Sequence, residues 1–426
     1  MREERTGAPS SGEASSPRGS LLLSLHLPAV ALGLGTGITM PVLPLLARSF
    51  DVSVGLAALV FIVQMLGGAA GTLPTGYAID RFGRRKVLIA GPVITAAAAF
   101  LIAGAGSFPE LLAYRFVGGL GQQMWMLSRL TVIADTGRSS QRGRQITSMF
   151  GAQRVGSLAG PLIGGFAATV WGLQVPFLMQ GAVTLLAVVP TLFIMRGAIP
   201  DRPAPVPPVD GETPSFGWRT FLVRPIPAVF AAQWLANVSR GGIEGGGILF
   251  LFGVYAYDAT AATLGVLSST MAAAGIPVML ASGFVMDRFG RKFTIVPGSL
   301  ALASGLVFTA ATAFFGWPFA AFVVSFVALH LAASSMAGSM QTIGTDIAPA
   351  YARGRFFGVS RLVAQSGRIG SPASFALLTE LASFGAAFAF LSVTALASGA
   401  IIAFFVSETL RRDPKTSVPA RTGSGD

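Results

Sequence analysis

Apolar residues fill long windows of the chain, and short turns rich in glycine, proline and charged residues separate them. A helix that crosses the roughly 30 Å core of a bilayer needs about 20 apolar residues. Windows of that length predict twelve membrane-spanning helices, which start near residues 21, 54, 87, 110, 145, 175, 225, 260, 293, 317, 356 and 385. We therefore predict an all-α membrane protein.

The composition supports a membrane protein and restricts its chemistry. Of the 426 residues, 52% are hydrophobic and 11% are charged, whereas soluble domains carry about 25% charged residues. The chain has no cysteine, so it can form neither a disulfide nor a thiolate metal site. The apolar run after Arg18 is too long for the core of a signal peptide and lacks a convincing cleavage site, so we expect a retained first helix.

Basic residues lie mainly on one side of this predicted topology. Most of the 30 Lys and Arg fall in the two tails and in every second turn, whereas the opposite side holds only Arg48. This bias predicts a multi-pass protein of the cell (inner) membrane with both termini in the cytoplasm. Because the cations are spread over many short anchoring segments, the net charge of +12 does not indicate a nucleic-acid partner.

A proline-rich polar segment divides the chain into two similar parts. Prolines prevent a helix there, so we predict a cytoplasmic linker at 197–224. The predicted domains are an N-tail (1–20), a six-helix bundle (21–196), this linker, a second six-helix bundle (225–407) and a C-tail (408–426). The sequence GYAIDRFGRRK at 76–86 recurs as GFVMDRFGRKF at 283–293. Such repeats are typical of secondary transporters, which bind substrate near the midplane between their halves.

These two turns resemble the signature turn of the major facilitator superfamily, and the similarity runs over nearly the whole chain. The resemblance implies two pseudo-symmetric six-helix bundles. It also implies a cytoplasmic latch, in which Asp80 lies against the N-terminus of the helix starting near 356 and Arg84 pairs with Asp135. A purely basic anchor would explain the arginines but not the repeated glycine and aspartate spacing. The residues assigned to the latch are Gly76, Asp80, Arg81, Gly83, Arg84, Asp135, Asp287, Arg288, Gly290, Arg291 and Asp346.

Three further stretches resemble motifs of the proton-coupled drug exporters within that family. They are LGTGITMPVLP at 34–44, LLAYRFVGGLG at 111–121 and GSLAGPLIGG at 156–165. The resemblance links Arg115 to proton movement and favours efflux by antiport over uptake by symport. The third stretch supplies the antiporter motif, which consists of Gly156, Gly160, Pro161, Gly164 and Gly165. Its small residues at helical spacing allow helices to approach closely.

Other readings of the glycine-rich sequence find less support. The run near residue 33 is no dinucleotide fingerprint, because no strand precedes it. A phosphate-binding GxxxxGK[ST] motif is missing from the sequence, so we do not expect ATP to drive transport on this chain. We also find no catalytic constellation. We therefore predict a transporter rather than an enzyme, without a cofactor or metal. A non-transporting membrane scaffold is the least favoured alternative, because both latch motifs are retained.

Six arginines fall inside the predicted membrane helices, where each costs roughly 2.5–3.5 kcal/mol at mid-helix. With other polar residues they form stripes at helical spacing, which predict a water-filled cavity. Snorkelling to the headgroups is the alternative for the arginines nearest the helix ends, Arg115, Arg129 and Arg361. The stripes are Arg115, Gln122 and Arg129; Gln233, Asn237, Arg240 and Glu244; His330, Ser334 and Gln341; and Arg361, Gln365 and Arg368.

The stretch RGGIEGGG at 240–247 combines two charges with five glycines. Arg240 and Glu244 are four residues apart and can pair, which lowers the cost of burying either charge. The glycines permit a bend and the close approach of a neighbouring helix. Glu244 is the one carboxylate placed well inside the membrane, and His330 is the other titratable candidate. We hypothesise that one of them exchanges a proton during transport.

The balance of interior charge predicts the substrate. The helices before residue 196 carry no interior acid, and Arg154 and Arg368 have no obvious protein partner in the sequence. A guanidinium fork matches carboxylate or phosphate, so we predict an organic anion or anionic amphiphile carried by a monomer. A lipophilic cation, or uptake of the anion, remains the alternative. The predicted substrate contacts are Arg154, Arg368, Arg240, Gln233, Asn237, Gln122, Gln365 and Trp125.

Overall fold

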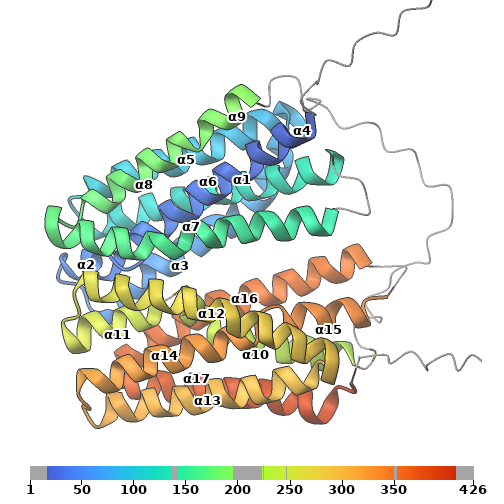
Figure 1. Ribbon diagram of the computed structural model, residues 1–426. Helices are drawn as coiled ribbons and strands as arrows, with labels where there is room; N and C mark the ends of the chain where they lie inside the picture. Colours follow the sequence, from blue (N-terminus) through green and yellow to red (C-terminus); the bar gives the residue numbers. More distant parts are fainter. Residues whose placement is uncertain are drawn as a thin grey trace, which may run out of the picture. The chain divides into compact units, whose positions relative to one another are not determined.

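The computed structural model describes residues 17–136, 142–194, 223, 225–245, 247–349 and 353–408. In these ranges the regular secondary structure is helical (Figure 1). The helices before the predicted linker are α1 (Pro17–Thr39), α2 (Leu43–Arg48), α3 (Val54–Ala70), α4 (Thr72–Phe82), α5 (Arg84–Ala103), α6 (Phe108–Thr136), α7 (Arg142–Trp171), α8 (Val175–Leu186) and α9 (Val188–Ile194). Those after it are α10 (Ile226–Glu244), α11 (Gly247–Tyr257), α12 (Ala261–Phe289), α13 (Lys292–Phe314), α14 (Phe319–Ser335), α15 (Ser339–Ile347), α16 (Arg353–Leu381) and α17 (Phe384–Phe405).

Each of the twelve predicted windows falls on one helix or on two helices separated by a short break. Within the described residues, six helical segments are long and apolar enough to cross a membrane, and the α3/α4 pair, bent by 41°, makes a seventh. The long helices α6, α7 and α16 have 29, 30 and 29 residues. They are long enough at 1.5 Å per residue, but they carry five of the six interior arginines and are therefore less apolar.

The helices form two compact units that differ from the two halves of the sequence. Unit 1 comprises Met1–Asp210, Gly245–Ala273 and Pro372–Phe384; unit 2 comprises Gly211–Glu244, Ala274–Ser371 and Gly385–Asp426. Consequently α11 belongs to unit 1, and α12 and α16 each contribute to both units. The predicted linker and tails fall almost entirely outside the described residues, so the predicted domain boundaries stay predictions.

Glycines bring α7 against two neighbours within unit 1. A Cβ atom at Gly156 would meet the carbonyl oxygen of Val30 on α1, and one at Gly164 would meet that of Ile38. On another side of α7, a Cβ at Gly165 would meet the carbonyl oxygen of Ala261 on α12. The small residues therefore provide the close approach that their spacing predicts, while their link to antiport stays a prediction.

Unit 1 also joins segments from both sequence halves at the end opposite the basic turns. Arg48, the last residue of α2, donates to the carbonyl oxygen of Val254 (2.5 Å) and pairs with Asp258 (2.6 Å). The Tyr255 hydroxyl donates to the carbonyl oxygen of Val52 over 3.0 Å. The single cation predicted on this side is therefore part of an ion pair that the sequence alone did not reveal.

A second such contact lies at the start of α3. The backbone N–H of Gly55 donates to the Glu380 carboxylate on α16 over 2.8 Å, where the positive end of the helix dipole favours an anion. A Cβ on Gly55 would collide with the Cγ of Glu380. Glycine at this position therefore makes room for the carboxylate.

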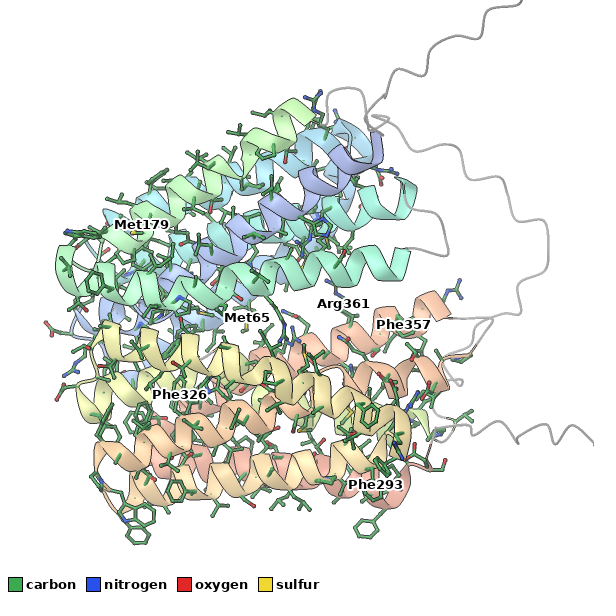
Figure 2. The ribbon with its side chains drawn as sticks, in the orientation of Figure 1. Met65, Met179, Phe293, Phe326, Phe357 and Arg361 are labelled. Carbon is green, nitrogen blue, oxygen red and sulfur yellow. The ribbon has the colours of Figure 1, made fainter. Side chains whose placement is uncertain are left out.

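Unit 2 packs aromatic and aliphatic side chains between α13, α14 and α17. Phe322, Phe326 and Leu329 on α14 are fully buried, as is Phe388 on α17. Figure 2 shows Phe326 within the packed helices, whereas Phe293 on α13 projects outward and is exposed. An outward apolar surface of this kind is expected of helices that face lipid.

Candidate functional site

The polar centre of unit 2 forms where α10 and α16 nearly touch. A Cβ on Gly367 would lie 2.7 Å from the carbonyl oxygen of Trp234 and 2.8 Å from the Cβ of Asn237. A Cβ on Gly241 would lie 3.0 Å from the Cα of Arg368. The Ser371 hydroxyl accepts a bond from the backbone N–H of Gly242 over 2.9 Å. Glycines on both helices thus allow a contact that larger residues would prevent.

This contact brings three predicted substrate residues into one network. Arg368 donates from Nε to Oδ1 of Asn237 over 3.3 Å. Asn237 donates from Nδ2 to the backbone oxygen of Gln233 over 2.7 Å. The side chain of Gln233 accepts from the Ser360 hydroxyl over 3.0 Å. The network runs along facing sides of the two helices, and Gln365 lies half-buried on the same helix as Arg368.

The predicted pair of Arg240 and Glu244 is confirmed, with Nε and Oε1 3.3 Å apart. The Arg240 side chain is 9% exposed and the Glu244 side chain 33%. Arg240 also donates to the carbonyl oxygen of Met336 over 3.2 Å, in the break between α14 and α15. Helix α10 ends at Glu244 and α11 begins at Gly247, so the glycine-rich stretch does interrupt its helix.

His330 occupies the interior of α14. Its Nδ1 lies 2.9 Å from the carbonyl oxygen of Phe326, and the two rings stack with centroids 4.3 Å apart. The imidazole ring contacts residues of its own helix. The Glu244 carboxylate instead pairs with Arg240 and is partly exposed. The proton-coupling role of either residue stays a prediction.

In unit 1, Arg115 is buried in a polar network of its own. It donates from Nε to the carbonyl oxygen of Val60 over 3.1 Å and from Nη2 to Oε1 of Gln64. Gln64 in turn donates to Oε1 of Gln122 over 3.0 Å. Arg115 is 5% exposed, so snorkelling does not describe it. Partners on α3 instead satisfy the arginine inside the bundle.

Arg129 is likewise buried, and at 1% exposure it does not snorkel either. Its guanidinium lies 3.8 Å from the centroid of the Trp125 ring and donates to Gln153 on α7 over 3.0 Å. Trp125 is buried beneath it, so in this structure the indole offers no surface to a ligand. Its assignment as a substrate contact stays a prediction.

The buried positions correct the expectation that every polar stripe borders open water. Arg115 and Arg129 in unit 1, and Gln233, Asn237 and Arg240 in unit 2, are buried among neighbouring helices. On α16, by contrast, the side chains of Arg361 and Arg368 are exposed (Arg361 is labelled in Figure 2). The two arginines of the α16 stripe are therefore accessible.

The prediction that Arg154 and Arg368 lack protein partners is wrong. Arg368 binds Asn237, and Arg154 also takes part in an interaction within the protein. Both are nevertheless exposed. The sequence could not reveal the partner of Arg368, because 131 residues separate it from Asn237.

The repeated turn of unit 2 forms a compact ion network. Arg291 lies 3.2 Å from Asp346 and 3.6 Å from Asp287. The backbone N–H groups of Arg291 and Lys292 donate to the two carboxylate oxygens of Glu408 over 2.9 and 3.0 Å. Gly290 has a φ of +119°, a conformation that favours glycine. Arg288 instead lies over the rings of Phe284 and Phe289.

The matching turn of unit 1 is described in part. Gly83 has a φ of +86°, and the adjacent Arg84 is buried and takes part in an interaction. Asp80 and Arg81 are exposed, and Arg81 donates to the Tyr77 hydroxyl over 2.9 Å. A Cβ on Gly76 would meet no atom within 4 Å. The side chain of Asp135 lies outside the described residues, so its pairing with Arg84 stays a prediction.

Five residues of these networks were not predicted from the sequence. Gln64 is a single amide in an apolar window, and this pattern could have identified it. Gln153 and Ser360 lie in helices where the arginines were the more prominent polar residues. Glu380 and Glu408 are acids near helix ends, and their partners lie too far along the chain to be found from spacing.

A membrane protein of two repeated six-helix sets, with buried charge networks inside each, has the architecture of a secondary transporter. The chain belongs to the Major Facilitator Superfamily, whose family model matches residues 27–258 and again 241–424. The predicted family and the predicted fold, all-α with twelve helices in two pseudo-symmetric bundles, are thereby confirmed.

Two relatives of known name are similar to parts of this chain. Multidrug resistance protein 1 of Bacillus subtilis (strain 168) is 28% identical over 288 residues, which are 66% of this chain and 70% of that protein. Quinolone resistance protein NorA of Staphylococcus aureus is 27% identical over 168 residues, 38% of this chain. The match spans 42% of NorA, less than half its length.

Solved transporter structures share the fold. A D-xylose–proton symporter superposes with a TM-score of 0.71 at 16% identity, covering 92% of this chain and 99% of that chain. A bacterial homologue of the iron transporter ferroportin gives 0.72 at 14% identity, covering 92% and 100%. At these identities the likeness concerns the fold alone.

Proposed function

We propose that this transporter exports an organic anion, or an amphiphile with an anionic group, in exchange for protons. It works as a monomer in the cell membrane with both termini in the cytoplasm. Substrate binds through guanidinium groups on its charged end and through apolar helix faces on its body. The export direction rests on the likeness of its motifs, and of its relatives, to multidrug resistance proteins.

One observation in particular supports an anionic substrate. Arg368 is exposed on α16 and, among the described residues, its polar contact is made through Nε to the neutral amide of Asn237. This contact leaves the charge uncompensated and the two Nη groups available. A guanidinium in that state binds a planar oxyanion with two parallel hydrogen bonds. Arg154 on α7, the other predicted main contact, is exposed as well.

A lipophilic cation is the second candidate, and one observation favours it. The Glu244 carboxylate is partly exposed beside Arg240. Its charge is paired, however, whereas that of Arg368 is not paired with an acid in the described structure, so the anion is the preferred substrate.

Binding to the purified protein tests the proposal. An aromatic carboxylate of the quinolone type and an amine of matched size should be titrated against wild type, Arg154→Ala, Arg368→Ala and Arg355→Ala. The last variant is a control near the basic end of the same helix α16. The carboxylate should bind wild type and the control more tightly than the amine, and either of the other two variants should weaken it at least about tenfold. Tighter binding of the amine to wild type, or full carboxylate affinity in both variants, refutes the proposal.

A further inference from the structure

Asn237 lies where the buried stripe of α10 meets the exposed arginine of α16. It is buried at 4% exposure, yet its side chain touches the exposed Arg368. The glycine contacts at Gly367 and Gly241 fix the spacing of the two helices on both sides of this pair. Backbone contacts therefore set the spacing of the two helices at Asn237.

The chemistry of its two neighbours fixes the orientation of the Asn237 amide. The backbone oxygen of Gln233 can only accept, so it must face the NH₂ group, at 2.7 Å. The guanidinium of Arg368 can only donate, so it must face the amide oxygen, at 3.3 Å. A flipped amide would place donor against donor and acceptor against acceptor. The acceptor is thus aimed permanently at Nε of Arg368.

Because Asn237 binds Nε of Arg368, only one edge of the guanidinium remains for a ligand. A guanidinium binds a carboxylate either through the edge of Nε and one Nη or through the edge of both Nη groups. With Nε occupied, the second edge is the one left for a ligand. It matches two coplanar oxygens and gives no such pair of bonds to a neutral ester or amide.

We propose that Asn237 is a positioning residue, which turns Arg368 so that its two Nη groups face the paired oxygens of an anionic substrate such as a carboxylate. Asn237 does so without touching the substrate and without neutralising the arginine. An aspartate at this position would keep an acceptor for Nε, but it would cancel the charge and turn its second oxygen toward the backbone oxygen of Gln233. A leucine would fill the same space but would release Nε. This inference rests on the proposed anion export and names the edge of the guanidinium that receives the anion.

The experiment measures the affinity ratio between an aromatic carboxylate and its uncharged methyl ester. Purified wild type, Asn237→Asp, Asn237→Leu, Arg355→Ala and Arg368→Ala are compared. Arg355→Ala is the control, because it removes an exposed cation of the same helix α16 that lies outside the network around Asn237. Ester affinity and a monodisperse elution profile report whether each variant is folded.

The expected result is a distinct ratio for each variant. Asn237→Asp should lower carboxylate affinity at least about tenfold, because it neutralises the guanidinium. Asn237→Leu should lower it severalfold, and Arg355→Ala should keep the wild-type ratio. Affinity for the ester should stay unchanged throughout.

Two other outcomes distinguish failure of the positioning role from failure of the proposed function. If Arg368→Ala loses the preference for carboxylate but both folded Asn237 variants keep it, the positioning role is overturned and anion export stands. If Arg368→Ala also keeps the wild-type ratio, the proposed function itself fails. Should Asn237→Leu not fold, the isosteric Asn237→Asp decides alone, and an unchanged ratio in that variant overturns the inference.

Discussion

Glu244 is the residue whose charge state is expected to couple substrate movement to protons. Its carboxylate is partly exposed and lies 3.3 Å from Arg240, which in turn holds the carbonyl oxygen of Met336. Protonation of Glu244 would remove the negative partner of a buried guanidinium. Because an unpaired buried charge is costly, Arg240 would then favour a different arrangement of α10 and the break after α14.

Glu244→Gln should therefore abolish substrate-driven proton flux in liposomes while substrate binding persists. His330→Ala should keep the flux and lower thermal stability, since the stack on Phe326 is lost. The measurement is acidification or alkalinisation of the liposome interior on addition of substrate. Full flux in both variants would rule out both residues as the proton carrier.

At the scale of elements, the contact of α7 with α1 depends on residues without side chains. Gly164→Ala would press a methyl group against the carbonyl oxygen of Ile38. Overpacking of this kind costs about 1–3 kcal/mol. The variant should therefore unfold at a temperature several degrees below wild type in detergent.

Gly151→Ala is the matched control on the same helix, because a Cβ there meets no atom within 4 Å. Alanine is favoured over glycine inside a helix by about 1 kcal/mol. This variant should therefore melt at or above the wild-type temperature. Equal melting temperatures for the two alanine variants would contradict the packing described for α7.

Part of this arrangement of elements could be predicted from the sequence. The helix windows, the repeat and the pair of Arg240 with Glu244 were predictable, because each depends on residues close together in the chain. The partners of Arg115 and Arg368 were not, because Gln64 and Asn237 lie on other helices. The spacing of polar residues along one helix also does not predict which of them a neighbouring helix buries. That depends on how closely the helices approach at their glycines.

At the scale of the whole molecule, Glu380 ties a helix of the second sequence half to α3 of the first. Alternating access rearranges the helices of a transporter, and we predict that this contact opens in each cycle. A Cβ on Gly55 lies so close to the side chain of Glu380 that a disulfide can span the two positions. Because the chain has no cysteine, the wild type is already a suitable background.

Gly55→Cys combined with Glu380→Cys should form a disulfide on mild oxidation and stop transport until a reductant is added. Each single variant should be insensitive to oxidation. The measurement is a mobility shift on electrophoresis alongside transport in the same liposomes. Undiminished transport by the cross-linked protein would show that this contact does not open during the cycle, and failure to cross-link would contradict the contact itself.

The central claim, export of a carboxylate in exchange for protons, is tested most directly in liposomes loaded at acid pH and diluted into alkaline buffer. Protons leaving through an antiporter should drive a labelled aromatic carboxylate inward, although a weak acid left to itself collects on the alkaline side. We predict accumulation with wild type and none with Arg368→Ala. Accumulation only when the outside is acid, or accumulation of the matched amine instead of the carboxylate, would contradict the account.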